Sequence, residues 1–188
     1  MPPEQGDGPV VGLVVGNPRP ASRTMSVAGE VARQLAGAVG GMLGPAVDLA
    51  AHGPAVLDPD AAGVRADLDA LRRADIVVVA SPTYKATYTG LLKAFLDRYG
   101  PPALTGVVAV PVMVGGAAAH AMAPEIHLRP LLVELGAVVP TRGLFVVEDE
   151  LDRLPDVVGD WLATAGVALR ALVEMKKSSP RSPQNNSE

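Results

Sequence analysis

Apolar and polar positions follow two repeating patterns along the chain. Short Val-rich runs that are apolar at every position predict strands buried on both faces of a sheet. Longer runs with apolar residues three and four apart predict helices. The predicted strands lie at residues 10–15, 46–49, 75–80, 107–114 and within 137–147. The predicted helices span residues 24–39, 64–73, 87–99, 128–136 and 157–177.

Two prolines interrupt this pattern. Pro111 lies inside the fourth predicted strand, although a proline normally marks an edge strand or a bulge. We retain the strand despite this conflict. Pro124 either opens or kinks the fourth predicted helix, so the sequence leaves the start of that helix open.

Strands and helices that alternate five times predict an α/β fold, with a parallel sheet covered by helices on both faces. Five strands favour the flavodoxin-like three-layer sandwich with strand order 2-1-3-4-5. In this order ligands bind beyond the carboxyl ends of the strands, near the switch point. We expect one domain at residues 10–177, with disordered tails at 1–9 and 178–188.

Composition and charge exclude several classes of function. The chain has 188 residues, 48% of them hydrophobic, which suits one domain with a substantial core. A net charge of −4 argues against nucleic acid as a partner. The absence of cysteine excludes disulfides, thiolate metal sites and cysteine nucleophiles. The sequence has neither an apolar run of membrane-spanning length nor a signal-peptide pattern, so we expect a cytoplasmic protein without membrane association.

The first of three loops at the predicted ligand-binding edge reads GNPRPASRT, residues 16–24. It joins a strand to a helix, whose N-terminal N–H groups and partial positive charge favour an anion. Arg19, Ser22, Arg23 and Thr24 would make this loop suit a terminal phosphate. The alternative is that a hydroxyl only caps the helix and the arginines are solvated. The position at the switch point favours phosphate binding, although neither a dinucleotide fingerprint nor a Walker motif is present.

The loops after the third and fourth strands suit a flat ligand. SPTYKAT, residues 81–87, combines backbone amides, an aromatic ring and a cation. The alternative is a plain turn with Thr87 as helix N-cap, which is compatible with ligand binding. GGAAAH, residues 115–120, has no bulky side chain before His120, which lets the backbone approach a planar molecule. Alone, this third loop is the weakest signal, since an ordinary tight turn would read the same.

Other chemistries are missing from the expected edge. A phosphorelay receiver needs acidic residues after the first and third strands, where this chain reads GNPRP and ASPTY. His120 and His127 have no further His or Cys near them in sequence, so we expect no metal site. Nothing resembles a Ser-His-Asp system, and no side chain is predicted to be a general acid or base.

Three motifs in order resemble one family. GNPRPASRT resembles the G-S-x-R-x-x-S-x-[ST] phosphate loop of the NADPH-dependent FMN reductases. ASPTYKATYTGLLKAFLD is similar to their isoalloxazine loop and the helix after it. The segment VAVPVMVGGAAAHAMAPEIHLRPLLVELGA resembles the flavin reductases that serve alkanesulfonate and methanesulfonate monooxygenases. The resemblance covers about residues 10–150.

The resemblance implies a flavodoxin-like fold, bound FMN, and homodimers or homotetramers. The phosphate ligands it implies are Arg19, Ser22, Arg23 and Thr24, with Asn17 as a weaker one. The implied isoalloxazine contacts are Pro82, Thr83, Tyr84 and Lys85 on one side and Gly115, Gly116 and Ala117 on the other. Lys85 or the backbone amides of its loop would stabilise negative charge on the reduced ring.

The chain departs from the family pattern at three places. Asn17 replaces the usual Ser, and Ala94 stands where many relatives have Asn. In the sulfonate-type reductases an inserted Tyr perturbs the fourth helix and tunes flavin retention. The matching stretch here reads Glu125-Ile126-His127. The sequence therefore does not decide whether the flavin is bound tightly or loosely.

The leading hypothesis is an NAD(P)H:FMN oxidoreductase that supplies reduced FMN to a partner monooxygenase. A second reading is an FMN-containing reductase of quinones, azo dyes or metal oxyanions. A third is a flavodoxin-like electron carrier, although carriers are usually strongly acidic around the flavin. The sequence does not decide NADPH against NADH, substrate against retained FMN, the final electron acceptor, or dimer against tetramer.

Overall fold

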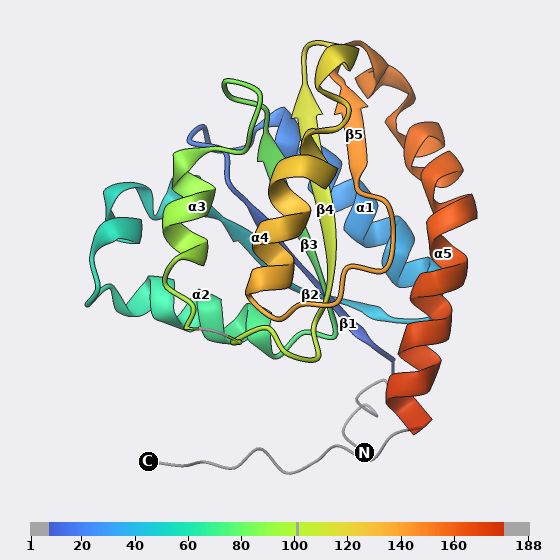
Figure 1. Ribbon diagram of the computed structural model, residues 1–188, viewed down its shortest axis with the longest axis horizontal. Coiled ribbons are helices and arrows are strands. Elements are labelled where there is room, and N and C mark those ends of the chain that lie inside the picture. The colour runs from blue at the N-terminus through green and yellow to red at the C-terminus, as the bar shows by residue number, and fades with distance from the viewer. Residues whose placement is uncertain (1–7, 101, 179–188) are drawn as a thin grey trace, which may run out of the picture.

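The computed structural model describes residues 8–100 and 102–178, and it contains a five-stranded parallel sheet between two layers of helices (Figure 1). The strand order is β2-β1-β3-β4-β5, and every neighbouring pair is parallel, which confirms the predicted flavodoxin-like topology. The strands are β1 (Val10–Val15), β2 (Met42–Asp48), β3 (Ile76–Pro82), β4 (Val108–Gly115) and β5 (Leu144–Val147). The tails predicted at 1–9 and 178–188 lie outside the described residues, apart from residues 8, 9 and 178.

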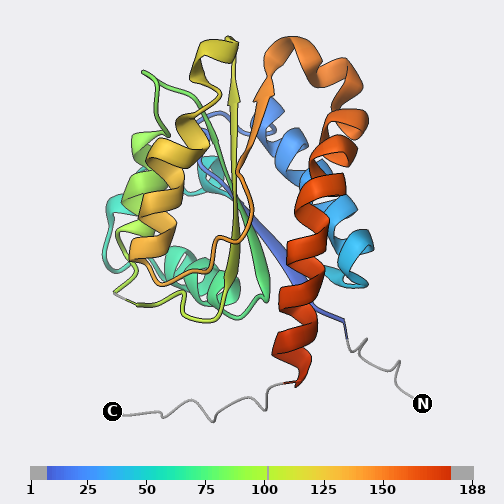
Figure 2. The same cartoon turned by 45° about the vertical axis from the view of Figure 1, so that its right-hand side comes forward.

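The helices form one layer on each face of the sheet. They are α1 (Arg23–Val39), α2 (Ala62–Arg72), α3 (Gly90–Leu96), α4 (Arg129–Glu134) and α5 (Leu154–Ser178). Figure 2 shows α1 and α5 on one side of the sheet and α2, α3 and α4 on the other. Short helical turns connect these elements: η1 (Leu49–Ala51), η2 (Gly53–Leu57), η3 (Ala118–His120), η4 (Pro124–Leu128) and η5 (Glu148–Arg153).

The central strand shows why the Val-rich runs form this sheet. Every residue of β3 is buried, as expected for a strand covered on both faces. Ile76 and Val78 pack with α1 and α5, whereas Val77 and Val79 pack with α2, α3 and α4. The sheet therefore separates two apolar clusters, and its carboxyl ends carry the loops of interest.

Pro111 lies in an internal strand, and the register explains why it is tolerated. The Ala109 N–H donates to the Val138 carbonyl at 2.9 Å. Pro111, two residues further, turns its nitrogen to the same side of β4. There the neighbouring chain leaves the sheet after Val138 and returns at Leu144, which pairs with Val112. The missing N–H of Pro111 therefore faces a gap in the hydrogen-bond ladder.

The predicted boundaries of two elements were wrong. The helix predicted at 87–99 begins at Gly90, because Thr87 pairs with Tyr84 in a tight turn. Its N-cap is Thr89, whose hydroxyl accepts from the Leu92 N–H at 3.1 Å, so the alternative with Thr87 as N-cap is wrong. The second strand begins earlier than predicted, at Met42, on the exposed edge of the sheet.

Pro124 opens a helical segment, but the first turn is a π-helix, η4, before α4 continues. Glu125 stabilises this turn, because it accepts from the Arg129 Nε at 2.7 Å. Arg129 in turn donates to the carbonyls of Val139 and Thr141 in the segment that leads to β5. The distorted turn that the family resemblance attributes to an inserted Tyr is thus present with Glu125-Ile126-His127 in its place.

Candidate functional site

The loop between β1 and α1, residues 16–22, ends in a helix cap. Ser22 is the N-cap of α1, and its Oγ accepts from the Met25 N–H at 3.2 Å. The capping alternative is therefore confirmed for Ser22. This bond uses a lone pair of the hydroxyl, so the O–H of Ser22 remains a donor for a ligand.

Asn17 and Thr24 form the buried floor of this loop. The Asn17 Nδ2 donates to the Thr24 Oγ1 at 3.1 Å, and both side chains are buried. The Asn17 Oδ1 accepts from the Arg19 N–H at 3.0 Å. The two side chains therefore fix the shape of the loop, while Arg19 itself is exposed at its rim.

Two carboxylates from the outer strands engage the donors of the same loop. The Arg23 Nη1 donates to the Glu148 Oε2 at 2.9 Å, and Glu148 directly follows β5. The Ala21 N–H donates to the Asp48 Oδ2 at 3.4 Å, and Asp48 ends β2. Sequence reasoning missed both acids, because they lie 125 and 27 residues from their partners and belong to no local motif.

Thr89 fastens the first loop to the second. Its Oγ1 donates to the Gly16 carbonyl, and its N–H donates to the Ser81 Oγ at 3.0 Å. The Gly16 N–H donates to the Ala80 carbonyl at 2.8 Å. A Cβ at position 16 would lie 2.4 Å from the Leu92 Cβ, so only glycine allows this close approach.

The second loop ends in a tight hairpin. Tyr84 and Thr87 exchange two backbone hydrogen bonds, of 2.8 and 3.2 Å. Between them, Lys85 and Ala86 have φ angles of +53° and +67°, the signature of a type I′ turn. Such turns favour Asn and Gly, so this tip is strained. The hairpin holds the exposed side chains of Tyr84 and Lys85 beyond the end of β3.

Thr83 joins the second loop to the third. Its N–H donates to the Val114 carbonyl at 2.7 Å. A Cβ at Gly115 would lie 3.1 Å from the Thr83 Oγ1 and 2.8 Å from the Phe145 Cζ. The Thr83 Oγ1 is buried and has no hydrogen-bond partner among the residues that the structure describes. A buried hydroxyl of this kind calls for a partner, and a polar ligand at the edge would supply one.

The structure brings the predicted site residues together at the carboxyl ends of the strands, the edge of the sheet where ligands are expected. The three loops follow β1, β3 and β4, which are neighbours in the sheet, and the bonds of Thr89 and Thr83 join them. Gly116 and Ala117 are exposed at the third loop. The edge offers guanidinium groups and a helix N-terminus at one end. At the other end lie small residues and the buried Thr83 hydroxyl, which has no partner in the described part of the chain. This arrangement fits an anion joined to a planar, hydrogen-bonding ring.

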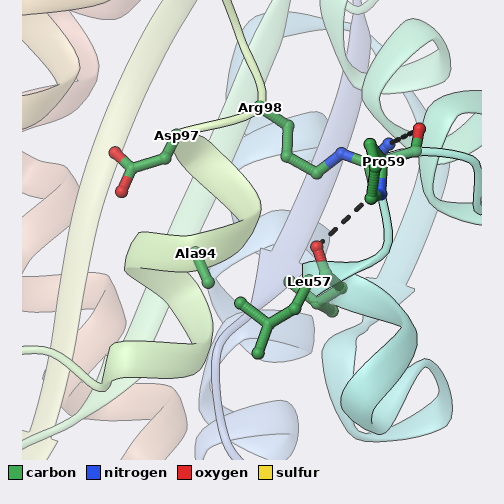
Figure 3. A pocket seen from close by; sticks show the side chains of 6 residues that line it. Leu57, Pro59, Ala94, Asp97 and Arg98 are labelled. Atoms are coloured by element: carbon green, nitrogen blue, oxygen red, sulfur yellow. Dashed lines mark hydrogen bonds between the residues drawn. The ribbon is translucent and has the colours of Figure 1, made fainter.

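A separate open groove of about 500 Å³ lies between η2 and α3 (Figure 3). Its lining includes Leu57, Pro59 and Ala94, and it contains none of the predicted site residues. Arg98 crosses it and donates to the Asp58 carbonyl at 2.6 Å and the Pro59 carbonyl at 2.9 Å. The Arg98 guanidinium therefore holds the loop after η2 in place.

The described part of the chain contains neither a candidate metal site nor a candidate membrane-spanning helix. Across residues 8–100 and 102–178, no cluster of three or more His, Asp or Glu side chains could hold a metal ion. Within the same ranges, none of the helices combines the length and apolar character needed to cross a membrane.

The chain belongs to the NADPH-dependent FMN reductase family, whose model matches residues 9–152. It is similar to an FMN reductase (NADPH) of Escherichia coli K12, with 36% identity over 92 residues, 49% of this chain and 48% of that protein. It is 34% identical to the NADH-dependent FMN reductase SfnF of Pseudomonas putida over 96 residues, 51% of this chain and 52% of that one. The chain therefore matches about half the length of these curated relatives.

A solved structure extends the likeness over more of the fold. An NADH:FMN oxidoreductase (EMOB), in its apo form, superposes with a TM-score of 0.70 at 30% identity. The match covers 83% of this chain and 89% of that protein. Both the sequence family and the fold thus agree with the resemblance seen in the three loops.

Proposed function

We propose that the protein is an NAD(P)H-dependent FMN reductase. The observation that carries this proposal is a single sheet edge that holds Arg19, Arg23 and the N-terminus of α1 together with the Thr83 hydroxyl, which is buried and unpartnered within the described residues. The likeness to reductases that are named for FMN supports the same activity. Bound FMN would supply the redox chemistry, by accepting a hydride from a nicotinamide and passing the electrons on.

At the phosphate end, we assign binding to Arg19, the O–H of Ser22 and the guanidinium of Arg23. These donors surround the start of α1, where unpaired N–H groups also favour an anion. Asn17 and Thr24 are buried below this loop, and the hydrogen bond between them keeps the loop in shape. A phosphate held here would fix one end of the flavin.

At the ring end, the residues from Pro82 to Lys85 would flank the isoalloxazine, with the Thr83 Oγ1 bonded to its polar edge. Gly115, Gly116 and Ala117 would let the backbone approach from the other loop. The ammonium group of Lys85, exposed at the hairpin tip, would stabilise negative charge on the reduced ring.

We further propose that a second copy of the chain and a monooxygenase are the protein partners, in the cytoplasm. Three large apolar side chains are exposed here: Met122 just before η4 (47%), Ile126 in η4 (59%) and Val133 in α4 (54%). These exposed apolar side chains lie along the segment from the turn before η4 to α4, and another subunit would cover them. The monooxygenase partner rests on the resemblance to sulfonate-type reductases.

The test is oxidation of NADPH and NADH by the purified protein in air, with and without added FMN. Activity that rises with added FMN supports a reductase that uses flavin as substrate. Activity from a yellow protein that ignores added FMN favours the reductase of another acceptor. Bound FMN without nicotinamide oxidation would favour the electron carrier and contradict the proposal.

A further inference from the structure

Arg23 meets a carboxylate at the place where a phosphate is expected. Its Nη1 lies 2.9 Å from the Glu148 Oε2, and the two side chains are 63% and 40% exposed. Arg23 begins α1 and Glu148 directly follows β5, so the pair joins the start of α1 to the carboxyl end of β5. The guanidinium thus already pairs with a carboxylate of this chain.

A phosphate and Glu148 would compete for the same donor. A carboxylate and a phosphate oxygen both take N–H bonds from a guanidinium, with similar geometry. A dianionic phosphate near Arg23 would also be repelled by the charge of Glu148. Binding therefore has to loosen or share the Arg23–Glu148 pair, and this requirement opposes the phosphate but not the ring.

We propose that Glu148 is an affinity-determining residue that competes with the flavin phosphate for Arg23 and so keeps FMN exchangeable. This inference rests on the proposed function. An exposed ion pair is weak, so Glu148 would lower the affinity for FMN without preventing binding. The effect suits a protein whose flavin has to leave after reduction.

The neighbouring acids of η5 provide the comparison. Glu150 is engaged elsewhere, because its Oε2 accepts from the Val147 N–H at 3.3 Å and its Oε1 lies 3.8 Å from the Arg153 Nη2. Asp149 is exposed and carries the same charge one residue from Glu148. Asp149→Asn thus removes one negative charge from the same turn and leaves the pair with Arg23 intact.

The experiment is a titration of the purified protein with FMN and with riboflavin, followed by flavin fluorescence at low and high salt. For Glu148→Gln we expect FMN affinity to rise roughly 1.5- to fivefold at low salt, in keeping with the strength of exposed ion pairs. Riboflavin affinity should stay unchanged, because riboflavin has no phosphate. Asp149→Asn should shift FMN affinity less, and high salt should shrink the gain of Glu148→Gln.

A double-mutant cycle with Arg23→Gln tests the competition directly. If Glu148 acts through Arg23, most of the gain from Glu148→Gln disappears in the Arg23→Gln background. Equal gains in both backgrounds, or an equal gain for riboflavin, would overturn the inference. A wild-type protein that prefers FMN to riboflavin but gains nothing from Glu148→Gln would refute this inference alone. A wild-type protein that binds neither flavin would refute the proposed function as well.

Discussion

The hydroxyl of Thr89 donates a hydrogen bond to the carbonyl of Gly16, 73 residues earlier in the chain. The same oxygen accepts from the Leu92 N–H at 3.1 Å, so it also caps α3. Thr89 is buried, with 4% of its surface exposed. One side chain therefore sets the start of α3 and the position of the first loop together.

Replacing Thr89 with Val should lower the free energy of unfolding by about 1–3 kcal/mol, because it removes a helix cap and leaves the Gly16 carbonyl without its donor. Urea denaturation followed by circular dichroism measures this loss. Thr89→Ser keeps the hydroxyl and should lose much less. A larger loss for the Ser variant than for the Val variant would show that packing of the methyl group, and not the hydrogen bonds, is what matters at this position.

Gly115→Ala tests the close approach of the third loop to the second. The new Cβ would lie 2.8 Å from the Phe145 Cζ and 3.1 Å from the Thr83 Oγ1, so we expect a loss of about 1–3 kcal/mol in stability and weaker FMN binding. At Gly116 a Cβ would meet no atom within 4 Å. Gly116→Ala should therefore change stability by less than about 0.5 kcal/mol. Thermal unfolding and FMN titration of both variants compare the two positions.

Ala86→Gly should stabilise the protein, against the usual effect of introducing glycine. Ala86 has a φ of +67°, which costs a non-glycine residue about 1–2 kcal/mol, and glycine removes that cost. We expect a net gain of about 0.5–1 kcal/mol in chemical denaturation. Ala163→Gly, at an exposed position within α5, should instead lose about 1 kcal/mol. A loss at both positions would rule out strain in the hairpin.

Glu125→Gln should destabilise the protein in a pH-dependent way. The Arg129 hydrogen bond is the main cause that holds the pKa of Glu125 below its ordinary value of 4.5. A lowered pKa in the folded state means that the ionised form adds stability above about pH 4.5, and that this stability is lost as the pH falls through the folded-state pKa. We expect a loss of about 1–2 kcal/mol at pH 7 that narrows below pH 4.5.

Denaturation of the wild type and of Glu125→Gln between pH 3 and pH 7, roughly the range over which carboxyl groups titrate, checks this sign. Glu134→Gln is the matched control, because Glu134 is an exposed glutamate at the end of α4. The control should show little change at any pH. A stability gap for Glu125→Gln that stays constant through acid pH would contradict the role of its charge.

Much of the fold could be predicted from local patterns. The fully apolar run at residues 76–80 forms a central strand because only a two-sided core accommodates it, and the first predicted strand agrees with β1 in both bounds. Leu35 and Val31, at helical spacing, are both completely buried on α1. The order of the strands then followed from their number and from the alternation with helices, and it placed the three loops at one edge.

The missed details depend on contacts between distant segments. Thr87 could not be excluded as an N-cap from its own sequence, because only its pairing with Tyr84 takes it out of the helix. The second strand is longer than predicted, because Gly44 and Pro45 weaken its sequence pattern but are tolerated on an edge strand. Glu148 reads as part of an acidic surface turn, and its relation to Arg23 exists only once β5 stands at the end of the sheet.

The π-helical turn of η4 changes the angle at which the chain enters α4. One residue more or fewer in a helix rotates everything before it by roughly 100° about the helix axis. The number of residues from Pro124 to Leu128 therefore sets the direction in which the third loop enters this segment. The hydrogen bond from Arg129 to the Val139 carbonyl holds α4 in place on the other side. We expect a single-residue deletion there to leave a regular helix and an unchanged sheet, and to shift the segment between Gly115 and Pro124.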